Sequence, residues 1–324
     1  MNTTRLCVLG AVLACAWGAA AQSGEPKRGG LVLQFDDGWS AWRTEVAPQL
    51  ARYGAKASGF VNNQNIHSGR IGFADLRALQ DEFGWEIGCH TYNHLNAVRF
   101  VQQRGMDAWL NEQMVRAVGE LKAEGLRVQD FVFPFNAYSP ELSRAVLDRG
   151  MGSYRRADPL ALADGRREDG SLPGTSIDLS RYVPLAVLKQ WVDLAHTRGQ
   201  LLFLYGHRVL PDSAFARGRV ASVTAQELVA DADVTLPSGD DVVLVPDASR
   251  RSTAASVGGL SVADGRRIRI SETGTDLTRL TAPGAEFLIG SSYGTRLSEF
   301  TNLIEYAAQR LTFYTVAEVV AGKK

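Results

Sequence analysis

Short apolar runs alternate with amphipathic helical stretches between Leu31 and His207, and this alternation constrains the fold more than any other feature of the sequence. The runs at Leu31–Phe35 and Leu201–Tyr205 are typical of buried strands, because each is almost continuously apolar and is followed by turn residues. Between such runs, apolar residues recur every three or four positions, as they do on one face of a helix. Strands separated by helices form parallel sheets or barrels, so the sequence predicts an α/β fold of that kind.

The alternation defines each expected element of this α/β region. The expected strands are Leu31–Phe35, Ala55–Val61, Trp85–Cys89, Val128–Phe133, Gly152–Tyr154 and Leu201–Tyr205. The expected helices are Ala41–Tyr53, Phe73–Phe83, Asp107–Gly125, Pro140–Arg149 and Leu185–Thr197.

The pattern changes after residue 210, where strand-like segments follow one another without helices between them. These segments are Asp241–Val245, Arg266–Ile270 and Glu286–Ile289. Helical periodicity returns at Leu297, and a short strand is expected at Thr312–Thr315. We therefore expect one α/β domain formed by residues 30–210 and 295–320, interrupted by a small β-rich insertion at 211–294. The insertion either binds a polymer or a partner, or covers one end of the barrel.

The composition of the 324-residue chain excludes several classes of protein. It carries 35 Lys and Arg residues and 35 Asp and Glu residues, so its formal net charge is zero. A balanced chain has no surplus of positive charge, and we expect no nucleic-acid partner. Hydrophobic residues make up 45 % of the chain, which favours a packed globular protein over a disordered or multi-span membrane protein.

The first residues, Met1–Ala21, have the pattern of a secretory signal peptide. Arg5 supplies the positive end, Leu6–Trp17 is a short apolar run, and Ala19–Ala21 is a small-residue cleavage site. The run is too short to span a bilayer of about 30 Å as a helix, so we expect no transmembrane span. We expect an exported protein, periplasmic or secreted. A lipobox-like run ending at Cys15 leaves open a lipid-anchored protein, and a buried N-terminal helix is a third interpretation.

The three cysteines limit the kinds of cross-link and metal site that the mature chain can form. Cys7 and Cys15 lie in the expected leader, so cleavage after it leaves only Cys89. A single thiol excludes an intramolecular disulfide and a cysteine-based metal site. We expect Cys89 to be a small core residue, and any metal to be bound by histidine and carboxylate.

Polar side chains follow three of the expected strands at the point where each strand ends. Asp36 and Asp37 end the first strand, His90 and His94 follow the third, and His207 follows the last. Because the carboxyl ends of parallel strands meet at one edge, we expect these groups to lie together. Alone, Asp-Asp-Gly is also ordinary turn chemistry, and the two histidines of the pair could be unrelated surface or core residues. On one helical turn, however, residues four apart point two imidazoles at one ion, and with a carboxylate they form a catalytic metal site with an open position.

These residues resemble the sequence motifs of the polysaccharide deacetylases of the NodB-homology group, carbohydrate esterase family 4. Phe35–Gly38 is similar to the first motif, Thr-Phe-Asp-Asp-Gly, with Gln34 in place of threonine. His90–His94 matches the second, His-Ser/Thr-x-x-His, and Phe131–Asn136 falls where the third, Arg-x-Pro-Tyr, is expected. His207 resembles the fifth. The resemblance covers the α/β part of the chain and implies the distorted (β/α) barrel of this family.

The resemblance also implies which residues bind a metal. Asp37, His90 and His94 would hold a divalent cation, for which Zn²⁺ is the best match to two imidazoles and one carboxylate, with Co²⁺ or Ni²⁺ as alternatives. Asp36 would be the general base that takes a proton from the metal-bound water, which is the nucleophile.

The remaining implied roles complete a deacetylation reaction. The backbone N–H of Phe135 would be the second oxyanion donor, and His207 would be the general acid that protonates the leaving group. The implied enzyme is a hydrolase acting on carbon–nitrogen bonds other than peptide bonds, with an acetylated polysaccharide as substrate. N-acetyl groups are favoured, because Phe131–Asn136 is similar to the third motif of a branch that acts on poly-N-acetylglucosamine. O-acetyl groups stay open.

Two departures from the family pattern concern the partners of the catalytic groups. Val132 stands where the third-motif arginine usually orients the base, so the partner of Asp36 is left open. The fourth motif, with its Asp and Trp, is not recognisable, and Arg181 or Asp178 is the candidate for its polar partner. Arg181 is also a candidate for contact with the substrate.

Aromatic residues near the motifs are candidates for stacking on sugar rings. Trp39 and Tyr138 are expected to contact substrate, with packing in the barrel as the alternative, and for Trp42 we favour packing. His67 and His196 have no supporting neighbours in the sequence and are expected to be structural.

Two other functions compete with the deacetylase. A non-catalytic carbohydrate-binding protein on the same fold is the main alternative, although binding alone requires neither a general base nor a general acid. A metallophosphoesterase would normally use two metals and more ligands than this chain places together. The number of metal ions per chain distinguishes them: one ion is expected for the deacetylase and two for the phosphoesterase.

Overall fold

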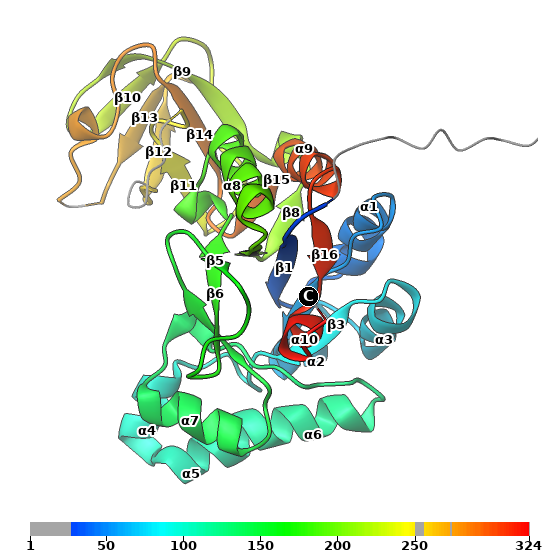
Figure 1. The fold of residues 1–324 in the computed structure, drawn as a ribbon. Helices are drawn as coiled ribbons and strands as arrows, with labels where there is room; N and C mark the ends of the chain where they lie inside the picture. The colour runs from blue at the N-terminus through cyan, green and yellow to red at the C-terminus, as the bar shows by residue number, and fades with distance from the viewer. Residues whose placement is uncertain (1–26, 250–255, 273, 324) are drawn as a thin grey trace, which may run out of the picture.

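A ring of parallel strands forms the main body of the structure, a computed structural model that describes residues 27–249, 256–272 and 274–323 (Figure 1). The strand order is β3-β2-β1-β7-β6-β4, and all neighbouring pairs in this order are parallel. These strands are β1 (Gly30–Asp37), β2 (Ser58–Val61), β3 (Glu86–Cys89), β4 (Tyr154–Ala157), β6 (Ser171–Ser176) and β7 (Leu201–Gly206). In addition, β16 (Thr312–Tyr314) pairs with the start of β1, and β5 (Leu162–Ala163) pairs antiparallel with β7.

The two edge strands of this order, β3 and β4, are joined through one residue, Phe131. It forms isolated parallel bridges with Cys89 of β3 and with Tyr154 of β4. The strand expected at Val128–Phe133 is therefore reduced to a single bridging residue, and the chain leaves the ring at Pro134, where a 3₁₀ turn begins. The bridges close the parallel sheet into a ring, which confirms the expected distorted (β/α) barrel.

The central strand β1 shows how the ring positions polar residues at one end. Its odd-numbered apolar residues belong to the large hydrophobic cluster shared with the surrounding helices: Leu31, Leu33 and Phe35. Val32 belongs to a second cluster inside the ring, with Phe203 of β7 and Val316 of α10 (Val316–Val320). Because side chains alternate along a strand, Asp36 shares the face of Val32 and lies at the carboxyl end of that interior.

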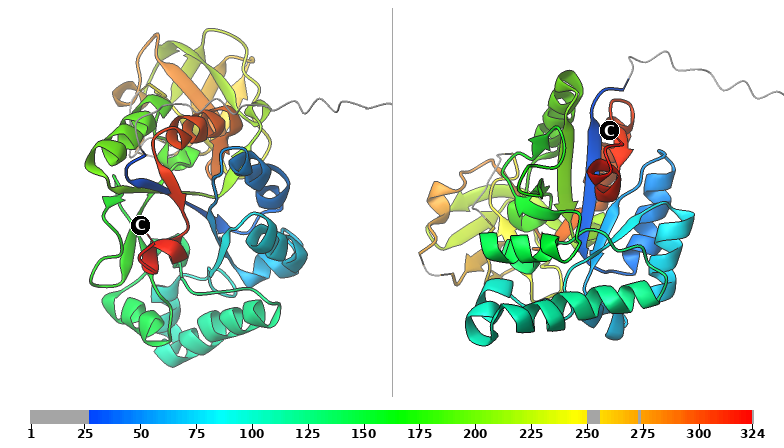
Figure 2. Two further views of the ribbon diagram at one scale, coloured as in Figure 1. Left: turned by 45° about the vertical axis from the view of Figure 1, so that its right-hand side comes forward. Right: turned by 60° about the horizontal axis from the view of Figure 1, so that its bottom comes forward.

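Helices cover the outside of the ring, while α10 lies near its centre in the left view of Figure 2. The covering helices are the π-helical turn η1 (Trp42–Val46) with α1 (Ala47–Ala51), α2 (Asn63–His67), α3 (Phe73–Glu82), α4 (Ala97–Arg104), α7 (Pro140–Asp148), α8 (Leu185–Arg198) and α9 (Leu297–Ala308). The helix expected from Asp107 to Gly125 consists of α5 (Met106–Trp109), a π-helical segment η2 (Leu110–Val115) and α6 (Arg116–Ala123). The other expected helices are present with boundaries within two residues.

A second, antiparallel sheet of six strands follows the ring, in the order β11-β14-β9-β10-β13-β12. Its strands are β9 (Ala216–Val223), β10 (Glu227–Ala230), β11 (Val242–Val245), β12 (Leu260–Ala263), β13 (Arg267–Ile270) and β14 (Glu286–Ser291). It has its own hydrophobic cluster, which includes Leu228, Ile268 and Phe287. The segments expected at 241–245, 266–270 and 286–289 are β11, β13 and β14, whereas β9, β10 and β12 have no counterpart among the expected strands.

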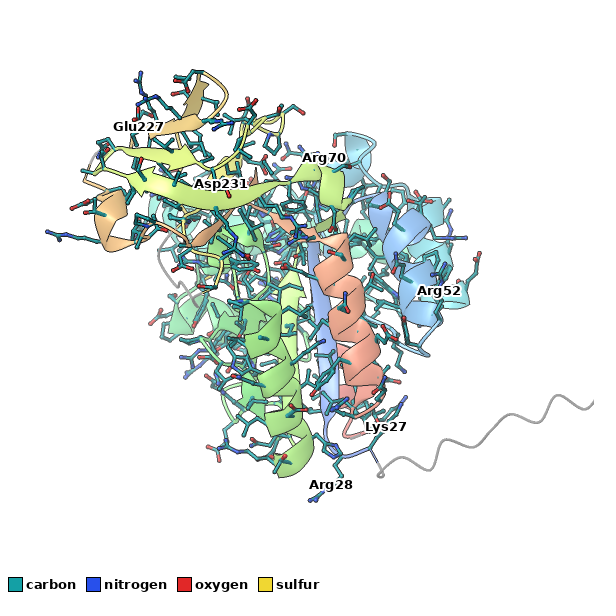
Figure 3. The ribbon with its side chains drawn as sticks, turned by 90° about the horizontal axis from the view of Figure 1, so that it is seen from above. Lys27, Arg28, Arg52, Arg70, Glu227 and Asp231 are labelled. Atoms are coloured by element: carbon teal, nitrogen blue, oxygen red, sulfur yellow. The ribbon has the colours of Figure 1, made fainter. Side chains whose placement is uncertain are left out.

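The second sheet lies at the carboxyl-end side of the barrel strands. Figure 3 shows Lys27 and Arg28, which precede β1, at one end of the molecule, and Glu227 and Asp231 of the second sheet at the other. Two short strands lie where the chain passes between the ring and the second sheet: β8 (Arg208–Leu210) pairs in parallel with β15 (Gly294–Arg296). The polar ends of β1, β3 and β7 therefore face the region where the second sheet begins.

Among residues 27–249, 256–272 and 274–323, no helix combines the length and the apolar character needed to cross a membrane. The expected leader at Met1–Ala21, and with it the cleavage site and the lipobox-like run at Cys15, lies outside the described residues.

Candidate active site

Three side chains from two strand ends form a cluster that fits a divalent cation. Asp37 is the last residue of β1, and His90 and His94 follow β3. One ligand atom from each residue lies within 4.8 Å of the others. The Oδ1 atom of Asp37 is 3.1 Å from Nε2 of His94 and 3.6 Å from Nε2 of His90. Two imidazole nitrogens and one carboxylate oxygen leave room for a further ligand, which is the donor set of a catalytic zinc site.

The two histidines are brought together by a loop, so the expectation of a helical turn was wrong. Residues 90–96 are not helical, and Thr91 and His94 have φ angles of 68° and 54°. The hydroxyl of Thr91 accepts a hydrogen bond from the backbone N–H of His94 (3.1 Å), which tightens the loop. Asp37 also has a positive φ, 79°. Left-handed backbone costs of order 1 kcal/mol or more per non-glycine residue and concentrates at functional sites, so the strain here accompanies the clustered ligands.

Hydrogen bonds to neighbouring groups set the protonation of the cluster. Nδ1 of the buried His90 donates to the carbonyl of Val132 (2.8 Å), which leaves Nε2 of the neutral ring as the atom directed at the cluster. Burial lowers the pKa of His90 to about 4, so the ring is neutral at neutral pH. Burial raises the pKa of Asp37, but the hydrogen bond from His94 and the other nearby histidines hold it below its ordinary value. Neutral imidazole and ionised carboxylate are the forms that bind a metal.

Asp36 points to the other side of β1 and is paired with an arginine from across the ring. Nη1 of Arg155, on β4, donates to Oδ1 of Asp36 (2.9 Å), and Nη2 donates to Oδ2. Both side chains are buried, and the guanidinium of Arg155 lies 3.8 Å over the ring of Tyr205. Burial alone would raise the pKa of Asp36, but Arg155 lowers it below the ordinary value. The partner that was left open in the sequence is therefore Arg155.

The Arg155–Asp36 pair gives a stability prediction with a matched control in the next residue. Replacing Arg155 with methionine leaves Asp36 buried without its partner, and we expect the free energy of unfolding to fall by about 3–5 kcal/mol. Arg156 pairs with Asp169 at the surface, with side chains 41 % and 46 % exposed, so Arg156→Met should change it by less than about 1 kcal/mol. Urea denaturation of both variants measures the difference. Equal, small effects would show that Asp36 does not depend on Arg155.

His207 is held by Asp178, which identifies the second open partner. Nδ1 of His207 donates to Oδ2 of Asp178 (2.8 Å), and the backbone N–H of His207 donates to Oδ1 (3.1 Å). Asp178 is buried and also accepts from the hydroxyl of Ser176. Burial lowers the pKa of His207, but the carboxylate of Asp178 outweighs it and raises the pKa to about 9. The indole N–H of the buried Trp42 donates to the carbonyl of His207 (3.1 Å), so Trp42 is a core residue that also fixes this loop.

Phe135 lies in the 3₁₀ turn after Phe133 with a left-handed backbone, φ 60°. The next two backbone N–H groups donate to the carbonyls of Phe133 and Pro134, whereas that of Phe135 has no acceptor within the part of the chain described. The Phe135 ring packs against His94 with 4.8 Å between ring centroids and an interplanar angle of 63°. An unpaired N–H beside the cluster is what an oxyanion donor requires.

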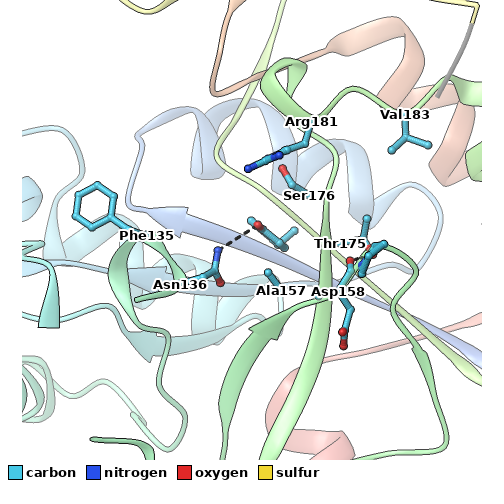
Figure 4. A pocket seen from close by; sticks show the side chains of 11 residues that line it. Phe135, Asn136, Ala157, Asp158, Thr175, Ser176, Arg181 and Val183 are labelled. Carbon is cyan, nitrogen blue, oxygen red and sulfur yellow. Dashed lines mark hydrogen bonds between the residues drawn. The ribbon is translucent and has the colours of Figure 1, made fainter. Parts of the chain in front are cut away.

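The three clustered ligands, the Asp36–Arg155 and His207–Asp178 pairs and Phe135 line one cavity of about 520 Å³. Its lining comprises Asp36, Asp37, His90, His94, Phe135, Asn136, Arg155, Ser176, Asp178, Ser180, Arg181, Tyr205, His207, Ser256 and Tyr293. A second cavity of about 400 Å³ adjoins it, and both are lined by Phe135, Asn136, Ser176, Arg181 and Tyr205 (Figure 4). The structure thus places the predicted ligands, base, acid and Arg181 at one site. Ser256 and Tyr293, from the region after residue 210, were missed because no motif singled them out.

Two of the expected substrate contacts lie elsewhere. Trp39 is partly buried, the guanidinium groups of Arg70 and Arg208 lie 4.7 Å and 4.9 Å from its ring, and it lines neither cavity. Tyr138 also lines neither and packs between Phe133 and Tyr154, with ring centroids 5.9 Å and 5.6 Å apart. The position of both rings favours the alternative of packing in the barrel.

The other singled-out residues also lie away from the cavities. Nε2 of His67 is 2.8 Å from a carboxylate oxygen of Glu120, and His196 donates to the carbonyl of Arg310. Cys89 is buried, and burial raises the pKa of its thiol to about 12, so it stays protonated.

Parts of the chain are similar in sequence to known proteins. A family model described as polysaccharide deacetylase matches residues 23–152. A bifunctional xylanase/deacetylase of Pseudobutyrivibrio xylanivorans is 36 % identical over 64 residues, which are 20 % of this chain and 10 % of the relative. The chain thus spans about a tenth of the length of the curated relative that it matches.

Solved structures with partial similarity include two carbohydrate esterases. A family 4 carbohydrate esterase from Streptomyces lividans, in complex with acetate, is 17 % identical, with a TM-score of 0.41, over 56 % of this chain and 80 % of that one. The Xyl-CE4 domain of a multidomain xylanase from the hindgut metagenome of Trinervitermes trinervoides is 22 % identical, with a TM-score of 0.36, over 55 % of this chain and 74 % of that one.

Proposed function

Because residues 23–152 belong to the polysaccharide deacetylase family, whose members are hydrolases of carbon–nitrogen bonds other than peptide bonds, we propose that this protein is a metal-dependent deacetylase. Its substrate in this proposal is an acetylated sugar polymer. The observation that carries the proposal is one cavity lined by a cluster of three possible metal ligands, by Asp36 with its arginine partner and by His207 with its aspartate partner.

The metal site would be formed by Asp37, His90 and His94. Two neutral imidazoles and an ionised carboxylate suit Zn²⁺ best, with Co²⁺ or Ni²⁺ as alternatives. When bound, a divalent cation supplies Lewis-acid chemistry, lowering the pKa of water and stabilising negative charge on an acyl oxygen. The His90 bond to the Val132 carbonyl orients one ligand before any ion arrives.

Asp36 is suited to accept a proton from the attacking water. Arg155 keeps its carboxylate ionised and fixes it through two parallel hydrogen bonds. Each carboxylate oxygen retains a lone pair for a further hydrogen bond. The arginine therefore orients the base without consuming its capacity to accept.

His207 and Phe135 serve the leaving group and the acyl oxygen. His207 is protonated at neutral pH because of Asp178, and its Nε2 is the atom left to donate a proton. The backbone N–H of Phe135, which has no acceptor among the described residues, would donate to the oxyanion. An amine departs readily only when protonated, so a histidine with a raised pKa favours N-acetyl over O-acetyl substrates.

The His207–Asp178 pair predicts the alkaline limit of activity. The acid form is required, so kcat/KM should fall as the pH rises through about 9, where His207 loses its proton. Asp178→Asn removes the charge that raises this pKa, and the alkaline limb should move to lower pH. The pH profile of acetate release from both proteins measures the shift. An alkaline limb that stays in place would mean that His207 is not the acid.

The direct test is acetate release across a panel of acetylated glycans, including N-acetylglucosamine oligomers and acetylated xylan, before and after chelation. We expect N-acetyl release that is lost with chelator and restored by Zn²⁺, with one ion per chain. A protein that binds a glycan but releases no acetate in the metal-loaded form would be the carbohydrate-binding alternative. Two ions per chain would favour the phosphoesterase.

We further propose that the protein works outside the cytoplasm, in the periplasm or secreted, on the strength of the expected leader at Met1–Ala21. Cell fractionation tests this proposal, and a purely cytoplasmic protein would contradict it.

A further inference from the structure

Tyr293 places an exposed aromatic ring against the proposed acid. It lies in the turn between β14 and β15, far along the chain from the motifs. Its ring is 4.9 Å from that of His207, centroid to centroid, at an interplanar angle of 61°. The residue is nevertheless 46 % exposed and lines the 520 Å³ cavity. Part of its apolar surface therefore faces the space that a substrate would fill.

Phe135 makes the matching arrangement on the proposed metal ligands. It packs against His94 in the same T-shaped manner, and it is 62 % exposed. Five large hydrophobic side chains are exposed among the described residues, and only Phe135 and Tyr293 of these line the cavity. Both rings thus present apolar surface next to the proposed catalytic groups.

The backbone of Tyr293 is fixed independently of its side chain. Its carbonyl accepts from the N–H of Arg208 (3.1 Å), and its N–H donates to the hydroxyl of Ser291 (3.2 Å). Within the described part of the chain its phenol oxygen makes no hydrogen bond. The exposed ring face and the unpaired hydroxyl are therefore both available for an interaction, and the Tyr293→Phe variant separates them.

We propose that Tyr293 and Phe135 hold a sugar ring of the substrate between them, so that Tyr293 is a specificity-determining residue supplied by the region outside the matched family segment. The proposal rests on the proposed function, because it takes the acetylated glycan as the occupant. Aromatic rings contact the apolar faces of pyranose rings, while polar groups in the same cavity bind the hydroxyl groups. Here Arg181 and Ser180 are polar neighbours in the lining.

The adjoining cavity indicates an occupant longer than one sugar. It continues past Phe135 and is lined by Asp158 and Arg181 among others (Figure 4). The adjoining cavity has a volume of about 400 Å³, in addition to the 520 Å³ of the cavity that the proposed catalytic groups line. An N-acetylglucosamine tetramer is therefore a better probe than a single acetylated sugar.

The experiment measures binding of the N-acetylglucosamine tetramer by calorimetry on the full chain without metal, which prevents turnover, and then KM and kcat on the Zn²⁺-loaded chain. Tyr293→Ala should raise Kd and KM about tenfold, the factor for about 1.4 kcal/mol, with a smaller change in kcat. Tyr293→Phe keeps the ring and should stay within about twofold of the wild type. Val115→Ala, which trims a residue of similar exposure (45 %) outside both cavities, should change nothing.

The outcomes separate this inference from the proposed function. A Tyr293→Ala protein with unchanged Kd and KM overturns the inference while acetate release by the wild type leaves the function standing. A wild-type chain that binds no tetramer also overturns it. Tetramer binding that depends on the Tyr293 ring, without any acetate release, supports the inference and contradicts the proposed deacetylase function. If Tyr293→Phe loses as much affinity as Tyr293→Ala, the hydroxyl and not the ring is what matters, and the inference is wrong.

Discussion

Replacing Asp37 or His94 with alanine should abolish metal binding and acetate release together. Each change removes one of three ligand atoms that lie within 4.8 Å of one another, and two ligands do not hold a catalytic divalent cation against dialysis. Metal content per chain after dialysis, measured by mass spectrometry, and acetate release from N-acetylglucosamine oligomers give the two readouts.

The control for this prediction is His67→Ala. His67 is a half-exposed histidine that pairs with Glu120 and lines neither cavity, so its loss should leave both readouts unchanged. Thermal unfolding verifies that each variant is folded. A His94→Ala protein that keeps one tightly bound ion would show that the cluster is not the metal site.

The second large effect is expected at Asp36, where the metal site and the proton transfer can be separated. Asp36→Asn removes the proposed proton acceptor but none of the three proposed ligands, so metal content should stay at one ion per chain. The value of kcat should fall by about 10²–10⁴, the usual contribution of a general base. The asparagine oxygen still accepts one hydrogen bond from Arg155, which preserves part of the pairing.

Steady-state kinetics on the metal-loaded Asp36→Asn protein, with metal content determined on the same sample, test this separation. Near-normal kcat would mean that another group takes the proton. Loss of the metal along with activity would instead place Asp36 among the ligands.

The parts of the barrel that could be predicted are those where the sequence is apolar. Strands β1 and β7 are buried on both faces and appear as continuous hydrophobic runs. Strand β6 is equally buried, yet its sequence, Ser171–Ser176, is polar and contains proline and glycine. Its small residues leave room for a large neighbour, because a Cβ at Gly174 would lie 2.6 Å from Cδ of Arg155. A strand shaped by a buried arginine does not show the hydrophobic pattern that identifies strands.

The site likewise contains residues that a sequence pattern predicts and residues that only the folded chain brings in. The sequence predicts that Asp37, His90 and His207 lie close together, because the carboxyl ends of parallel strands meet at one edge of the sheet. The contact of Arg155 with Asp36 is not predictable in this way, since the two residues are 119 positions apart and lie on strands, β4 and β1, that are not neighbours in the sheet. The position of Tyr293 in the cavity depends on how the second sheet packs against the barrel, and no local sequence pattern predicts that packing.

A valine occupies the place where the family's motif carries its arginine, and the guanidinium reaches the buried carboxylate from another strand. A buried carboxylate needs a positive charge close to it in space, and any segment of the chain can supply that charge. A comparison of motif letters alone would count position 132 as a loss, although the folded molecule supplies a guanidinium to Asp36 from Arg155. Relatives with the same gap are better sorted by asking whether a cationic side chain on the opposite wall fills it.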